Sequence, residues 1–92
     1  MNFIAATVEL RTQNTDSINA YGLDYRGAEA VVPSGNSSGE VRLRLLCYNR
    51  EGAKLDAFTN WKTGTRALVT GYLVFSEDTS QPLDLLVTTI EP

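Results

Sequence analysis

The sequence predicts an all-β fold in which five strands form a barrel, with one short helix between the third and the fourth strand. Apolar and polar residues alternate with a period of two in several segments, which is typical of strands with one buried face. One segment instead spaces its apolar residues by three and four, which indicates a helix. A length of 92 residues suits one domain, residues 1–92.

The first third of the chain predicts a strand, a loop and a second stranded segment. Residues 2–10 alternate, and one face of this strand carries Ile4, Ala6, Val8 and Leu10. Residues 11–19 are polar and rich in turn formers, so we expect a loop there. Residues 20–32 contain two glycines, which predict a bent or bulged strand pair that ends at Val32.

The clearest strand is predicted at residues 40–49, after a turn-rich loop at residues 33–39. The face expected to point into the core carries Val41, Leu43, Leu45 and Cys47. The opposite face carries Arg42, Arg44, Leu46 and Tyr48. This strand therefore turns two guanidinium groups and an aromatic ring outward.

Residues 50–62 predict the helix, because Leu55, Phe58 and Trp61 recur at a spacing of three. We expect these three side chains to lie in the core. The candidate residues at the helix ends are Asn49 as the N-cap, Lys62 in the last turn and Gly64 after it.

Two further strands complete the chain, at residues 65–75 and 83–90, with a polar hairpin tip at residues 76–82. In the first of them Gly71 predicts a bulge or a sharp coil of the strand. Its inward residues are Ala67, Val69 and Leu73. Three strands, a helix and two strands is the element order of an OB-fold, a five-stranded Greek-key barrel. In such barrels the second and third strands hold extended ligands.

The composition excludes several chemistries. Histidine is absent and Cys47 is the single cysteine, so neither a histidine-dependent catalytic triad nor a zinc site can form. The sequence has no nucleophile–base pair and no glycine-rich phosphate loop, so we expect no catalytic residue, no metal and no cofactor. No apolar run approaches the roughly 18 residues of a membrane span, and no signal peptide is evident. These features favour a cytoplasmic location.

Several segments resemble the bacterial and phage single-stranded-DNA-binding proteins. They are MNFIAATVEL, RLRLLCYNREGAKLDAF, WKTGTRALVTGYL and QPLDLLVTTIEP, with AEAVVPSG similar to a shortened second strand from a compact branch of that family. The resemblance implies an OB-fold that binds single-stranded DNA in replication, recombination or repair, associated with the nucleoid. It also implies a homo-oligomer, a tetramer or else a dimer. An open edge at the first strand would gain from pairing with another chain.

The sequence also departs from that family. Val8 stands where the family has a glycine in its first strand, and Trp61 lies in the predicted helix rather than on the sheet. The acidic C-terminal tail through which the family recruits other proteins has no counterpart in this sequence. We therefore expect the DNA-holding function without the recruiting function.

Binding of single strands without sequence preference requires cations along a groove and flat side chains on which bases stack. Arginine suits both roles, because its guanidinium group pairs with phosphate and also stacks. The resemblance implies that Tyr48 is a base-stacking residue and that Tyr72 lies on the ligand side of its strand. The predicted nucleic-acid-binding residues are Arg26, Arg42, Arg44, Arg66, Tyr25, Tyr48 and Tyr72.

Several of these residues have a second interpretation. Arg42 and Arg44 would also suit an ordinary solvated strand face, and Tyr48 would suit a contact with a neighbouring subunit. Packing in the core or a loop suits Tyr21 and Tyr25 better than stacking does.

The charge balance argues against strong DNA binding. The chain has 8 Lys and Arg against 11 Asp and Glu, a net charge of −3, and such a field opposes the approach of a polyanion. We therefore expect weaker and more salt-sensitive binding than a basic domain would give. The alternative function is an OB-fold module for protein–protein interaction, or a replication-accessory subunit, without strong DNA affinity.

Overall fold

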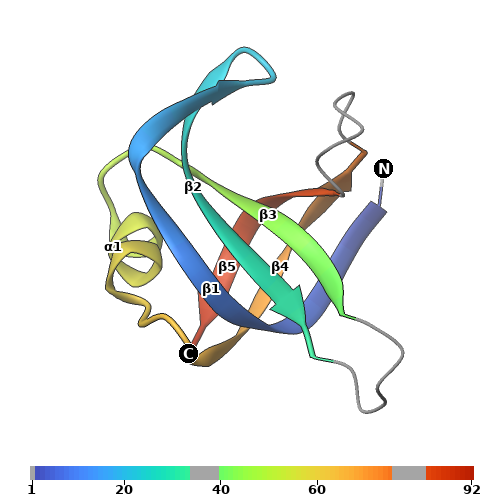
Figure 1. Ribbon diagram of the computed structural model, residues 1–92. Coiled ribbons are helices and arrows are strands. Elements are labelled where there is room, and N and C mark those ends of the chain that lie inside the picture. Colours follow the sequence, from blue (N-terminus) through green and yellow to red (C-terminus); the bar gives the residue numbers. More distant parts are fainter. Residues whose placement is uncertain (1, 34–39, 76–82) are drawn as a thin grey trace.

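The computed structural model describes residues 2–33, 40–75 and 83–92 (Figure 1). Its elements are β1 (Asn2–Ala20), β2 (Leu23–Val32), β3 (Val41–Tyr48), α1 (Ala53–Asn60), β4 (Arg66–Val74) and β5 (Asp84–Glu91). Within these residues the predicted β class, with five strands and one short helix, is confirmed. Most of the loop predicted at residues 33–39 and the whole tip predicted at residues 76–82 lie outside the described residues.

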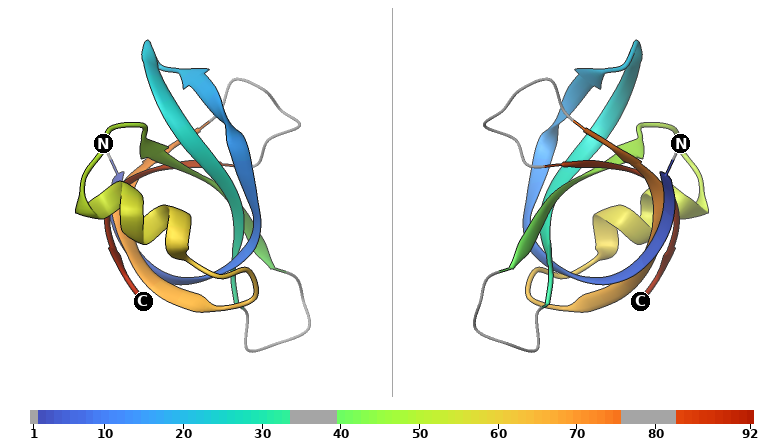
Figure 2. Two further views of the ribbon diagram at one scale, coloured as in Figure 1. Left: turned by 90° about the vertical axis from the view of Figure 1, so that its left-hand side faces the viewer. Right: turned by 90° about the vertical axis from the view of Figure 1, so that its right-hand side faces the viewer.

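The strands close into a barrel in the order β1-β2-β3-β5-β4, and β4 pairs again with β1. Neighbouring strands are antiparallel except β3 and β5, which run parallel. The β3–β5 ladder places Arg44 opposite Asp84 and Leu46 opposite Leu86. Figure 2 shows the ring of strands with α1 lying across one end of it.

β1 is much longer than the sequence predicts. Residues 11–19, expected to form a loop, continue the strand, so that prediction was wrong. β1 pairs with β4 through residues 2–9 and with β2 through residues 9–20. Its second half forms with β2 an arm that extends from the barrel (Figure 1), and most of its side chains are exposed. Such a ribbon needs backbone pairing rather than an alternating apolar face, which explains why the polar residues are compatible with a strand.

The chain reverses at Tyr21 and Gly22, whose φ angles are 52° and 77°. Two consecutive positive φ angles are typical of a type I′ turn, which matches the twist of a hairpin. Residues 20–32, predicted as a bent or bulged strand pair, therefore form this turn and one strand, β2. The irregularities in pairing occur in β1, between Leu10 and Thr12 and between Gln13 and Ser17.

The core follows most of the alternation predicted for β3. Leu43, Leu45 and Cys47 are buried, as expected. Val41, predicted to point inward, is 52 % exposed because it begins the strand at the end of the barrel. Leu46, on the outer side, is fully buried. The outer face of β3 is therefore covered at its middle and open elsewhere.

The helix begins at Ala53, later than the start predicted from residues 50–62. Gly52 takes the N-cap position, and no side chain caps the helix. Asn49, the predicted cap, instead donates from Nδ2 to Oδ2 of Asp24 at 3.2 Å. The predicted cap therefore connects the end of β3 to β2.

The apolar face of α1 closes the barrel as predicted. Phe58 is fully buried, Trp61 is 8 % exposed and Leu55 is half-buried against the core. Gln13 of β1 donates from Nε2 to the carbonyl oxygen of Phe58 at 2.6 Å, which connects the helix to the arm. In the described part of the chain, no helix has the length and apolar character that crossing a membrane requires.

The bulge predicted at Gly71 lies on the partner strand instead: Thr70 is opposite Thr89 and Gly71 is opposite Val87, so Thr88 of β5 is the extra residue. A Cβ atom at Gly71 would collide with the carbonyl oxygen of Leu86 on β5. The absence of a side chain at this position therefore lets the two strands approach closely.

Cys47 makes the stability of the fold depend on pH. Burial raises the pKa of its thiol, although Lys54 and Arg26 lower it in part. The unfolded chain therefore loses this proton at a lower pH than the folded chain. As a result, the free energy of unfolding falls as the pH rises above about 8.5, by at most about 1.4 kcal/mol per pH unit from this group.

Cys47→Ala is expected to remove this part of the pH dependence, as measured by urea unfolding between about pH 7 and pH 10. The comparison of the two slopes cancels the titration of the tyrosines, which both chains share. An equal slope in the two chains would contradict the prediction.

Candidate nucleic-acid interface

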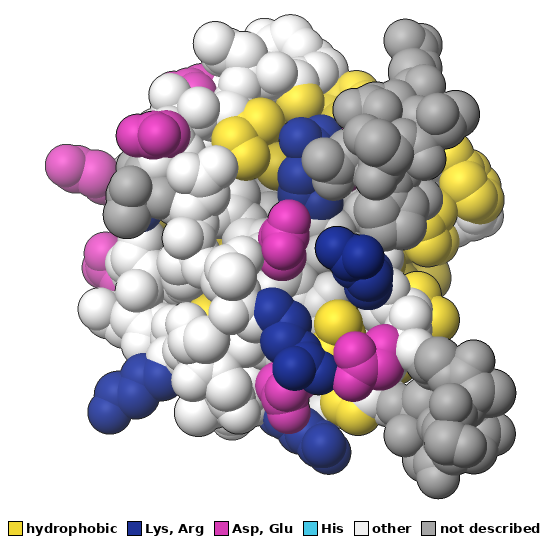
Figure 3. Space-filling model, viewed as in Figure 1, with side chains coloured by type: hydrophobic (Ala, Val, Ile, Leu, Met, Phe, Trp, Pro, Cys, Tyr) yellow, Lys and Arg dark blue, Asp and Glu magenta, His cyan; other side chains and the backbone are white. Residues whose placement is uncertain are grey.

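The predicted ligand surface is the outer side of β2 and β3, here named the β2–β3 outer face. Its residues are Tyr25, Gly27, Glu29 and Val31 on β2, opposite Tyr48, Leu46, Arg44 and Arg42 on β3. Alternate residues of paired strands share a face, so the structure brings four of the seven predicted site residues together. On the side shown in Figure 3, basic and acidic side chains alternate along the middle of the molecule.

Arg44 is held by a buried carboxylate. Its Nε donates to Oδ1 of Asp84 at 2.7 Å and its Nη2 donates to Oδ2 at 2.8 Å. Asp84 is fully buried at the start of β5. The hydroxyl of Tyr21 donates to Oδ2 of the same carboxylate at 2.6 Å, which brings the β1–β2 turn onto the barrel. Because bidentate, charge-assisted pairs are strong, the first role of Arg44 is to neutralise Asp84.

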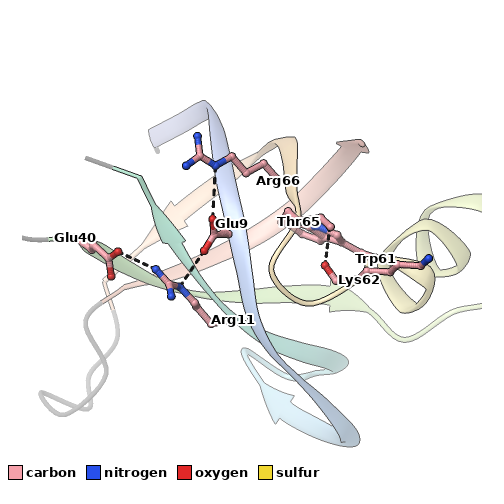
Figure 4. A network of polar contacts seen from close by, with 7 residues as sticks. All are labelled: Glu9, Arg11, Glu40, Trp61, Lys62, Thr65 and Arg66. Carbon is pink, nitrogen blue, oxygen red and sulfur yellow. Dashed lines mark hydrogen bonds and ion pairs between the residues drawn. The ribbon is translucent and has the colours of Figure 1, made fainter. Parts of the chain in front are cut away.

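The exposed arginines lie at and beside the Arg42 end of the β2–β3 outer face, the end away from Tyr48. Arg42 itself is exposed on β3. Arg11 donates from Nη2 to Oε1 of Glu40 at 2.8 Å and lies 3.5 Å from Glu9, as Figure 4 shows. Arg66 lies 3.6 Å from the same Glu9. Ion pairs near the surface stabilise a fold by roughly 0–1 kcal/mol, so breaking these pairs would cost the fold little.

The register places these groups in a row across four strands. Glu9 of β1 is opposite Arg66 of β4 on one side and Val31 of β2 on the other, and Val31 is opposite Arg42. Neighbouring strands lie about 4.8 Å apart, so the Arg42 and Arg66 backbones are about 14 Å apart. Measured along the curved sheet, this separation is too large for both guanidinium groups to contact one phosphate.

Tyr48 and Tyr25 form an aromatic pair at the helix end of the face. Their ring centroids are 6.2 Å apart with an interplanar angle of 66°, an edge-to-face arrangement. Tyr48 is 39 % exposed, whereas Tyr25 is 6 % exposed. Tyr48 therefore offers a ring to a ligand, and Tyr25 supports that ring from within the protein.

The remaining predicted site residues lie elsewhere. Arg26 is on the inward side of β2, opposite Cys47, and its Nε is buried without a hydrogen-bond partner among the described residues. Tyr72 is on the outer side of β4, opposite Phe3 of β1, with the ring centroids 5.1 Å apart. The structure thus separates Arg26 and Tyr72 from the β2–β3 outer face.

A groove of about 310 Å³ borders the face beside Arg44. Its walls are the bulged part of β1, residues 27–29 of β2 and Arg44 itself. A Cβ atom at Gly27 would collide with the side chain of Ile18, so the glycine lets the arm close over β2 at this point. The groove extends the β2–β3 outer face toward the arm, and Glu29 of that face also lines the groove.

Sequence reasoning missed the carboxylates of this surface and one of its arginines. Arg11 was expected in a loop, so its place beside the third strand was not foreseen. β3 itself has no carboxylate on its outer face, but Glu40 precedes it and its neighbours supply Glu29 opposite Arg44 and Asp84 beside it. The acidic residues inside the other predicted strands could have indicated these carboxylates. Placing them beside the arginines, however, requires the register between the strands.

The residues of the surface are the whole basis for assigning a function. In the described ranges, no three cysteine, aspartate or glutamate side chains gather in a way that could hold a metal ion. Comparison of the chain with models of protein families, with curated proteins and with solved structures finds no match.

Proposed function

We propose that the barrel is an OB-fold that binds single-stranded DNA without sequence preference, in replication, recombination or repair. The strand order β1-β2-β3-β5-β4, with α1 between β3 and β4 in the chain, supports the OB-fold. In OB-folds the second and third strands, with the adjoining loops, hold oligonucleotides. The single observation that carries the proposal is the exposed Tyr48 ring on the same strand face as Arg42.

The exposed ring and the arginines on and beside the β2–β3 outer face have different roles in this mechanism. The exposed ring of Tyr48 stacks on a base, which any sequence allows because every base has a flat face. Arg42 pairs with phosphate, and Arg11 and Arg66 exchange their carboxylate partners for phosphate. Arg44 remains on Asp84 and fixes the shape of the surface. This division leaves fewer phosphate contacts than the sequence alone predicts.

The carboxylates make binding weak and dependent on salt. Glu9 and Glu40 form ion pairs with Arg11, and Glu9 also pairs with Arg66. DNA must therefore displace these two carboxylates from the arginines. The number of phosphates contacted determines the slope of affinity against salt. With three arginines on phosphate, we therefore expect measurable affinity only at low salt, and a slope of log affinity against log salt of only about −2.

Tyr48→Ala is expected to weaken binding to fluorescein-labelled oligo-dT by about 5- to 150-fold, since stacking contributes about 1–3 kcal/mol per base. Tyr48→Phe keeps the ring and is expected to retain the affinity. Fluorescence anisotropy at low salt measures both. Equal affinity of the alanine and wild-type chains would exclude Tyr48 from the site.

Arg42→Ala tests the phosphate contact with the same assay. The slope of log affinity against log salt is expected to fall by about one. Lys62→Ala, an exposed cation beyond the end of α1, is the matched control and is expected to leave the slope unchanged. Absence of any anisotropy change for wild-type protein at low salt would overturn the proposal.

The alternative function is a protein-interaction module without strong DNA affinity. The observation in its favour is that carboxylates accompany the cations of the surface, with Glu9, Glu29 and Glu40 beside the arginines. Mixed charge suits a protein partner of complementary pattern better than a polyanion. A wild-type chain that shows no anisotropy change with oligo-dT even at low salt would favour this function.

A further inference from the structure

The groove of about 310 Å³ beside the β2–β3 outer face lies on the path of a bound strand. It follows a cross-strand row in which Thr12 of β1 is opposite Glu29 of β2, and Glu29 is opposite Arg44 of β3. Arg44 stands between Tyr48 and Arg42 on the same face of β3. A DNA strand that contacts both Tyr48 and Arg42 therefore passes the mouth of the groove.

The groove exists because the pairing of β1 with β2 is interrupted. The register shifts between Gln13 and Ser17, so that residues 14–16 of β1 stand opposite the single Gly27 of β2. Residues in such a bulge have no ladder partner, and the strand bends at that point. Ile18 packs over Gly27 and gives the hollow an apolar wall. Its volume is near the lower end of the roughly 300–1,000 Å³ typical of ligand pockets, which suits one base of a strand.

The groove contains a carboxylate without a basic partner among the described residues. Glu29 is exposed and lines the groove. Its cross-strand neighbour Arg44 instead donates to both carboxylate oxygens of Asp84. An exposed carboxylate on a surface for a polyanion opposes binding through its charge. It favours binding only where the ligand donates a hydrogen bond to it, because an ionised carboxylate is an acceptor alone. The ligand group that suits Glu29 is therefore a donor.

Asn14 of the bulge lines the same groove and supplies a donor. Its Oδ1 accepts the backbone N–H of Asp16 at 3.1 Å, so the amide faces a ligand with its Nδ2 donor. Together with Glu29, the groove thus offers one acceptor and one donor. Cytosine presents the complement, because its N4 amino group donates and the adjacent ring N3 accepts. Thymine presents the reverse, a carbonyl oxygen beside an N–H group.

We propose that this groove receives one base of the bound strand and selects cytosine over thymine, with Glu29 accepting a hydrogen bond from the N4 amino group. The inference rests on the proposed function, because the strand must first lie on the β2–β3 outer face. Arg44 adds a flat guanidinium group on which the base stacks, while its pair with Asp84 stays intact. Thymine has a carbonyl oxygen in place of the amino group, so the carboxylate would face it without a proton between them. The other bases of the strand bind without selection.

The test compares labelled oligo-dC, oligo-dU and oligo-dT of equal length by fluorescence anisotropy at low salt. Uracil lacks the methyl group of thymine, so oligo-dU separates the effect of the amino group from that of the methyl group. The wild-type chain is expected to bind oligo-dC about 5-fold or more tightly than the other two, which are expected to bind alike. In Glu29→Gln the side chain keeps its shape but its amide can also donate, so this preference is expected to disappear.

Glu40→Gln is the matched control. It removes the same charge from an exposed carboxylate outside the lining of the groove, so it is expected to change the three affinities equally and to keep the preference. Circular dichroism verifies that both variants are folded. A preference for oligo-dC that is lost in Glu29→Gln and kept in Glu40→Gln supports the proposal.

Three other results overturn it. Equal binding of the three oligonucleotides by the wild-type chain does so and leaves the proposed function intact. A preference that persists in Glu29→Gln, or that Glu40→Gln also abolishes, shows that Glu29 does not select the base. Absence of binding to all three oligonucleotides overturns the proposed function itself, and this inference with it.

Discussion

Arg44→Ala is expected to lower the free energy of unfolding by about 3–5 kcal/mol, a large share of the stability of a small domain. The substitution removes both donors that the guanidinium group supplies to Asp84. The carboxylate is fully buried, so it would remain as a charge without its counter-ion, although the Tyr21 hydroxyl would still donate to it. Urea unfolding at neutral pH measures the loss.

Arg42→Ala is the matched control for this prediction. Arg42 is exposed on the same strand face, and its removal is expected to change the free energy of unfolding by about 0.5 kcal/mol or less. Replacing Arg44 and Asp84 together by Met and Leu is expected to restore most of the stability, because no buried charge is then left unpaired. An Arg44→Ala chain as stable as wild type would show that Asp84 does not depend on this pair.

The same result changes how DNA-binding data must be interpreted. A loss of binding in Arg44→Ala would combine a change in the fold with the loss of a cation, so it does not identify a phosphate contact. Arg42→Ala and Tyr48→Ala are free of this difficulty, since both side chains are exposed. They therefore test the proposed interface, and Arg44→Ala tests the scaffold beneath it.

Phe58→Ala is expected to cost about 3–5 kcal/mol, the usual range for a fully buried aromatic residue. Phe58 has no exposed surface, and it is the only residue of α1 that is fully buried. Its removal leaves a cavity at the end of the barrel that α1 covers. Thermal or urea unfolding measures the effect. Thr59→Ala, the exposed neighbour, is the control and is expected to cost about 0.5 kcal/mol or less.

A loss below about 1 kcal/mol for Phe58→Ala would contradict the role of α1 as the closing element of the core. A loss in Thr59→Ala as large as that in Phe58→Ala would instead indicate that the helix itself, rather than the buried ring, had been disrupted. The pair of variants thus separates packing from helix formation.

The parts of the fold that follow from local pattern were predictable. Alternation identified Leu43 and Leu45 as core residues, because a strand with one buried face repeats every two residues. The spacing of Phe58 and Trp61 identified the helix face in the same way. Gly71 marked the irregular pairing of β4 with β5, because a side chain at this position would collide with β5. Each of these signals lies within one element.

The parts that depend on distant pairing were not predictable. The extension of β1 through residues 11–19 depends on β2 and on the Tyr21–Gly22 turn, and the polar residues of that segment resemble a loop. The pairing of Arg44 with Asp84 depends on the parallel β3–β5 register, which no local pattern reveals. For this reason the sequence indicated the strand of the candidate site, β3, but not which of its two arginines is exposed to a ligand.

The double pairing of β1 has a consequence for how the chain folds. Its first half, residues 2–9, can be placed only after residues 66–73 have been synthesised, because β4 supplies its partner. Closing such a large loop costs conformational entropy before the contacts form, so the barrel has a high contact order and folding in milliseconds to seconds is expected. The first half of β1 therefore pairs only after β4 is available, whereas the arm, whose two strands are adjacent in the chain, can form early.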